Sequence, residues 1–163
     1  MQIRRARETD APKITEIFNH EVANAAAIWV ETSVDETNRR AWLAERQAKN
    51  WPVLVAEDNN EVLGFGSYGP FRPYEGFRNT VEHLVYVSSA ARGKGVGRLL
   101  LTALIEDARQ HGMKVIVGAV DAENEPSLKL HQALGFIETG RMMRIGEKWG
   151  QRRHMVLLQK ELA

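Results

Sequence analysis

Residues 80–100, TVEHLVYVSSAARGKGVGRLL, carry three signals that set the fold class. Alternating β-branched and apolar residues over 80–87 predict a central strand. Glycines at positions 93, 95 and 97 predict a loop, and apolar residues at helical spacing from residue 96 predict a helix closed by Gly112. Backbone N–H groups at a helix start lack partners within the helix, and glycines let an anion approach them. This order indicates an anion site.

Two nucleotide-binding motifs look similar to this loop, and neither fits it. A P-loop requires GxxxxGK followed by Ser or Thr, whereas the loop here is RGKGVGRL. The dinucleotide fingerprint requires GxGxxG, whereas the glycines here simply alternate. Taken alone, the loop is equally consistent with a flexible turn that carries incidental basic residues.

The composition narrows the class of protein further. The chain has 163 residues and a formal charge of +1, so no global field attracts nucleic acid or an anionic membrane. The absence of cysteine excludes disulfides, thiolate metal sites and a cysteine nucleophile. The scattered histidines lack metal-ligand spacing, so we predict no metal. With no membrane-spanning apolar run and no signal-like N-terminus, we expect a cytoplasmic protein without a membrane partner.

The remaining chain predicts a single domain over residues 1–163. Strands are expected at 3–6, 51–58, 61–69 and 114–120 and around 136–145 and 152–162, and helices at 11–26, 36–50 and 124–134. The segment 70–79, PFRPYEGFRN, is predicted to be an ordered functional loop. The order β-α-α-β-β-β-α-β-α-β-β predicts an α/β fold, with a mixed central sheet and helices on both faces.

A second motif follows some 25 residues after the glycine loop. Residues 124–136 show N-x-x-S-x-x-L-H-x-x-x-G-F, and residues 92–97 show R-x-x-G-x-G. With both motifs in this order, nearly the whole chain resembles the GNAT N-acetyltransferases. The resemblance implies acetyl-coenzyme A (acetyl-CoA) as donor, its pyrophosphate on the glycine loop and its pantetheine arm paired with the strand. The cofactor-binding residues it implies are Val85, Tyr86, Val87, Gly93, Lys94, Gly95, Val96, Gly97, Arg98, Asn124 and Ser127.

Acetyl transfer to an amine requires a base for the ammonium and a proton for the leaving thiolate. Glu82 is the best candidate base because it lies on the strand that leads into the loop, although an edge-exposed glutamate is the alternative. His83 should point to the opposite face by strand alternation, so the two should not serve one site directly. His131, four residues after Ser127, is the candidate acid, and a packed helix histidine is an equal alternative.

A closer resemblance concerns the acceptor. AAIWVETSVD, PFRPYEGFR and TVEHLVYV resemble the phosphinothricin/methionine sulfoximine acetyltransferase branch, whose members acetylate the α-amino group of small amino acids and commonly form homodimers. The guanidinium of Arg72 offers a fork for a carboxylate, and Phe71, Tyr74 and Phe77 could wall an apolar pocket; a surface cation and core aromatics are an equal alternative. The resemblance further implies an acceptor site made by Trp29, Arg72, Pro73, Tyr74, Glu82, His83 and Leu84.

Some residues depart from this branch. Arg152 and His154 stand where a tryptophan and an aspartate would align, and Leu84 replaces a common serine. These differences leave the identity of the acceptor open.

From both resemblances we predict an acetyl-CoA-dependent N-acetyltransferase that acts on a small amino acid or analogue by direct transfer in a ternary complex. The alternatives are an enzyme for another amine (a protein N-terminus, a lysine or a polyamine) and a non-catalytic acetyl-CoA-binding module.

Overall fold

The computed structural model describes residues 1–163, and its seven strands and four α-helices follow the predicted order. None of these helices is long and apolar enough to cross a membrane. The elements are β1 (Gln2–Arg5), α1 (Ala11–Asn24), α2 (Glu36–Ala48), β2 (Val53–Asp58), β3 (Glu61–Pro70), β4 (Thr80–Val87), α3 (Val96–Gln110), β5 (Val115–Asp121), α4 (Glu125–Ala133), β6 (Ile137–Lys148) and β7 (Gln151–Glu161).

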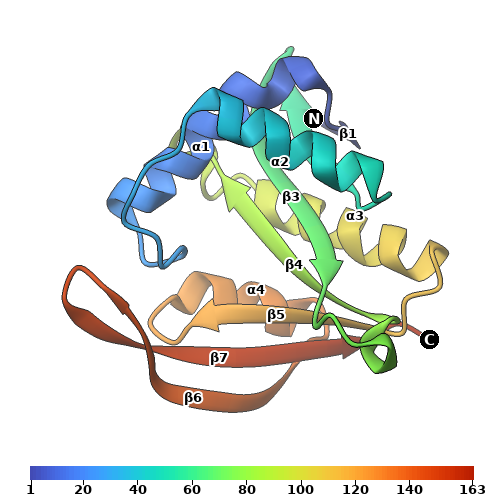
Figure 1. Ribbon diagram of the computed structural model, residues 1–163, viewed down its shortest axis with the longest axis vertical. Helices are drawn as coiled ribbons and strands as arrows, with labels where there is room; N and C mark the ends of the chain where they lie inside the picture. Colours follow the sequence, from blue (N-terminus) through green and yellow to red (C-terminus); the bar gives the residue numbers. More distant parts are fainter.

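All seven strands form one sheet in the order β1-β2-β3-β4-β5-β7-β6. Only β4 and β5 pair in parallel, so the predicted mixed sheet is confirmed. Their pairing covers residues 80–82 against 115–117, whereas β4 stays paired with β3 through Val87. Beyond Glu82 the two strands therefore diverge, as Figure 1 shows. This divergence positions the candidate site.

The two faces of the sheet are covered by different helices. In Figure 1, α1 and α2 lie in front of the sheet, and α3 and α4 lie behind it. Leu84 and Tyr86 pack into the cluster under α1 and α2, whereas Val81 and Val85 pack under α3 and α4. By strand alternation, Glu82 faces the α1–α2 side and His83 the α3–α4 side. The predicted helices on both faces are confirmed.

The C-terminal hairpin of β6 and β7 is tied to the end of α1 by a buried lysine. Lys148 is only 2% exposed, and its ammonium donates to the backbone carbonyls of Ala25, Ile28 (2.6 Å) and Glu21 (3.4 Å). Burying an ammonium is costly unless acceptors surround it, and these carbonyls supply them. The hairpin is thereby held beside the loop that follows α1.

Arg152 and His154, the residues that depart from the branch pattern, stabilise an irregularity in β6. The pairing of β6 with β7 shifts between Met142 and Gly146, and Arg144 has a left-handed φ of 57°. The Arg144 N–H donates to His154 Nδ1 at 2.7 Å, and the Arg152 guanidinium donates to the Arg144 carbonyl. These two side chains satisfy backbone groups that the bulge removes from the ladder.

Candidate active site

The divergence of β4 and β5 opens a cleft of about 1180 Å³. Its walls come from β4, the glycine loop, the start of α4, the ends of β3 and β5, and the C-terminal part of α1. Because the cleft passes between two strands, side chains from both faces of the sheet reach it. The predicted site residues that line it are Glu82, His83, Leu84, Val85, Tyr86, Val87, Gly93, Gly95, Val96, Gly97, Arg98, Asn124, Ser127 and His131.

The glycine loop presents a run of free N–H donors. None of the backbone N–H groups of residues 93–98 donates to another backbone group. Gly93 and Gly95 have φ angles of 76° and 81°, a left-handed conformation that favours glycine, and Gly95 is the N-cap of α3. Arg92 forms an ion pair with Glu21, a buried residue of α1, which fastens the loop to that helix. Converging N–H groups at a helix start suit an anion such as a diphosphate.

The edge of β4 that faces the cleft is open. Residues 83–87 pair with β3 on one side and, beyond the short parallel segment, with no strand on the other. An extended chain with amide groups can add to such an edge as a further strand. At the far wall, Asn124 Oδ1 accepts from the Ser127 N–H at 3.3 Å, which caps α4. The N–H groups of the glycine loop suit the pyrophosphate of acetyl-CoA, and the open edge of β4 suits its pantetheine amides.

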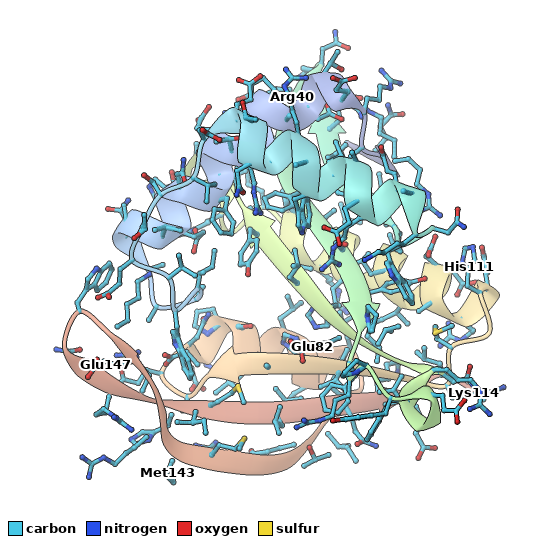
Figure 2. All side chains as sticks on the ribbon, in the orientation of Figure 1. Arg40, Glu82, His111, Lys114, Met143 and Glu147 are labelled. Atoms are coloured by element: carbon cyan, nitrogen blue, oxygen red, sulfur yellow. The ribbon has the colours of Figure 1, made fainter.

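Glu82 stands at the point where β4 and β5 part, and Figure 2 labels it there. Its carboxylate reaches solvent in the cleft, yet the walls exclude part of the surrounding water. This desolvation raises the pKa of Glu82 above its ordinary value of 4.5, and Glu82 forms no ion pair. A carboxylate with a raised pKa and no protein partner is suited to accept a proton.

His83 and His131 form a buried pair on the opposite face. Their Nε2 atoms are 2.9 Å apart, their rings stack with centroids 5.0 Å apart, and His131 is only 3% exposed. Because the Ser127 carbonyl can only accept, His131 Nδ1 donates to it at 2.7 Å, and His131 Nε2 accepts from His83. Burial lowers the pKa of His131 and lowers that of His83 to about 3, so the pair is neutral.

Several residues predicted for the acceptor site lie outside the cleft lining. Arg72, Pro73 and Tyr74 do not line it; Tyr74 is 70% exposed, and the Arg72 guanidinium lies over the Phe71 ring at 5.5 Å. Trp29 is not part of the lining, but its Nε1 donates at 3.0 Å to Asp121, which lines the cleft. The predicted cofactor residue Lys94 is also absent from the lining.

Arg46 lines the cleft and is not among the site residues predicted from the sequence. It belongs to α2 and donates to Ser67 Oγ at 2.8 Å. A signal for it exists in the sequence, because Arg46 follows the core residue Leu43 by three positions and therefore lies on the apolar side of the helix. The described chain holds no group of three or more His, Asp or Glu side chains that suits a metal ion.

Known proteins share this whole architecture. The family model described as "Acetyltransferase (GNAT) family" matches residues 13–136. The L-methionine sulfoximine/L-methionine sulfone acetyltransferase of Pseudomonas aeruginosa is 48% identical, over 98% of this chain and 94% of that protein.

Two solved structures superpose closely on the chain. The ribosomal-protein-alanine N-acetyltransferase of Brucella melitensis has a TM-score of 0.98 and 46% identity, covering 99% of this chain and 100% of that one. The phosphinothricin acetyltransferase of Sinorhizobium meliloti, in complex with acetyl-CoA, has a TM-score of 0.96 and 31% identity, covering 99% and 88%. The chain is a member of the GNAT acetyltransferase family.

Proposed function

We propose that this protein transfers the acetyl group of acetyl-CoA to the α-amino group of a small amino acid or analogue, of the methionine sulfoximine, methionine sulfone or phosphinothricin type. The observation that carries the proposal is the cleft, in which an anion-binding loop, an open strand edge and the unpaired carboxylate of Glu82 lie together. Relatives that carry these acceptor names and share 31–48% identity support the choice of acceptor.

Acetyl-CoA would lie along the cleft, with its pyrophosphate and its pantetheine arm bound by different elements. The N–H groups of the loop at 93–98 would bind the pyrophosphate, and the backbone of Val85, Tyr86 and Val87 would pair with the pantetheine amides. Asn124, whose amide nitrogen makes no hydrogen bond within the protein, and Ser127 would contact the arm near the thioester. Loop binding through backbone groups explains why Lys94 need not reach the cleft.

The chemistry needs no covalent enzyme intermediate, and the chain has no cysteine to carry one. Glu82 accepts a proton from the acceptor's ammonium, directly or through one water. The neutral amine attacks the thioester carbonyl carbon, a C–N bond forms and the C–S bond breaks. The nitrogen gives up its second proton as the amide forms, which balances the proton that the thiolate of coenzyme A takes up. His131 as the source of that proton stays a prediction, because both of its ring nitrogens are engaged within the protein.

A protein N-terminus is the second candidate acceptor. It is favoured by the likeness to the Brucella melitensis structure, whose name specifies a ribosomal-protein alanine. A free amino acid and a peptide N-terminus both offer an α-amino group, and they differ in the neighbouring group. The amino acid carries a carboxylate, and the peptide carries an amide.

We also propose that the protein forms a homodimer through β6. This strand is an edge of the sheet and exposes the apolar side chains of Ile137 (62%), Met143 (65%) and Ile145 (50%). Exposed apolar edges mark association surfaces. Sedimentation equilibrium should give twice the 18.4 kDa mass of the chain. The cytoplasmic location stays a prediction.

A thiol-release screen tests the proposed function. The purified protein is mixed with acetyl-CoA and with methionine sulfoximine, methionine sulfone, phosphinothricin, standard amino acids, polyamines or an alanine-initiated peptide. We expect release of coenzyme A with the first group, and acetylated product by mass spectrometry. Release with the peptide alone would favour the second candidate. Binding of acetyl-CoA without thiol release from any amine would indicate a non-catalytic module.

A further inference from the structure

Arg46 is a cation that the fold leaves without an anion. Its guanidinium lies over the ring of Trp42, with 5.2 Å between the central carbon and the ring centroid, and donates one hydrogen bond, to Ser67 Oγ. Arg46 forms no salt bridge, and the neighbouring Glu45 is paired with Lys49. Of five N–H donors, the remaining four have no protein acceptor.

This guanidinium is oriented by its hydrogen bond to Ser67 and by the ring of Trp42. Ser67 is fully buried, and its hydroxyl donates to the Pro52 carbonyl at 2.7 Å, so its oxygen is oriented to accept from Arg46. Desolvation lowers the pKa of Arg46, which shows that holding the charge here is costly. A preorganised, half-buried guanidinium that faces a cleft can recover this cost by binding a carboxylate.

Arg46 and Glu82 lie on the same face and at the same end of the cleft. A Cβ added to Gly69 would stand 3.1 Å from Arg46 Nη1, so the guanidinium lies directly over this glycine. Gly69 is the residue opposite Glu82 in the β3–β4 pairing. Directly opposite residues of an antiparallel pair project to the same face of the sheet. A cation and an anion therefore flank one point of the cleft.

The free α-amino acid has the matching arrangement, with an ammonium and a carboxylate on one carbon. We infer that Arg46 binds the α-carboxylate of the acceptor and so places its α-amino group at Glu82. This inference rests on the proposed function and names the determinant of its substrate class. It assigns to Arg46 the role that the sequence had predicted for Arg72, and it disfavours peptide N-termini, which have no α-carboxylate.

The test compares two acceptors that differ only at the carboxylate, L-methionine sulfone and its α-carboxamide, in steady-state kinetics. Arg46→Gln should lower kcat/KM for the sulfone by roughly 10- to 100-fold, as expected for lost hydrogen bonds to a charged group. It should leave kcat/KM for the carboxamide and the KM for acetyl-CoA within about twofold of wild type. Arg46→Lys keeps the charge, so its kcat/KM for the sulfone should fall by less than that of Arg46→Gln.

Two matched variants serve as controls. Arg39→Gln removes the neighbouring guanidinium, which also lies over Trp42 but does not line the cleft, and it should not change the carboxylate preference. Arg72→Gln tests the competing residue, and it should likewise leave the preference for the carboxylate over the carboxamide unchanged. Equal losses for both acceptors in Arg46→Gln, or a carboxylate-selective loss in Arg72→Gln, would overturn the inference. A wild type that acetylates neither acceptor would contradict the proposed function itself.

Discussion

The two faces of β4 differ in whether their polar side chains have hydrogen-bond partners within the protein. On the α1–α2 face, Glu82 has no hydrogen-bond partner in the protein, and the one hydrogen bond of Arg46 goes to a serine hydroxyl. On the α3–α4 face, the Nε2 atoms of His83 and His131 bond to each other and His131 Nδ1 bonds to the Ser127 carbonyl, while the buried His83 Nδ1 has no partner. An unpaired charge beside a cleft is a candidate for ligand binding, whereas hydrogen bonds between buried side chains hold the structure together. We therefore expect the proton transfer from the acceptor on the α1–α2 face and a mainly structural role for the histidine pair on the α3–α4 face.

Replacing the carboxylate should produce the largest effect. Glu82→Gln keeps the size of the side chain but removes the proton acceptor, so kcat should fall by about 10²- to 10⁴-fold. Steady-state thiol release with methionine sulfone at saturating acetyl-CoA measures this loss. Glu61→Gln, at the exposed start of β3, is the matched control and should retain wild-type kcat. A Glu82→Gln enzyme with wild-type kcat would remove Glu82 from the chemistry.

Substitutions in the histidine pair on the opposite face should mainly lower the stability of the protein. His131→Ala leaves the Nε2–H of His83 without a partner and opens a void beside Phe136, whose ring centroid is 4.9 Å from that of His131. The free energy of unfolding should fall by about 2–4 kcal/mol, measured by urea denaturation. Gln132→Ala, on the exposed side of α4, should change it by less than about 0.5 kcal/mol. Unchanged stability in His131→Ala would contradict the supporting role of the pair.

Local signals in the sequence predicted much of the fold and of the donor site. Strand β4 covers the predicted residues 80–87, and the glycine loop and the Asn124 cap lie where their residue types indicate. Each of these features depends on neighbours within a few positions of the chain. The resemblance to acetyltransferases then connected them to one ligand.

The acceptor side was harder to predict because it depends on distant contacts. The extent of pairing between β4 and β5 joins segments more than 30 residues apart, and it opens the cleft between the strands instead of on one face. Arg46 reaches the site through Ser67, which is 21 residues away, and no local pattern encodes that approach. Arg72 stays a prediction for the acceptor site; its guanidinium lies over the Phe71 ring and does not line the cleft.

The central claim is that Glu82 is the base, and the pH dependence of kcat/KM tests it most directly. A base must be ionised to act, so activity should rise with pH through the pKa of Glu82, which desolvation places above 4.5. In wild type, acetylation of methionine sulfone should show this inflection, separate from that of the acceptor amine. In Glu82→Gln the lower inflection should be absent and the residual rate low. The same inflection in both proteins would contradict the account.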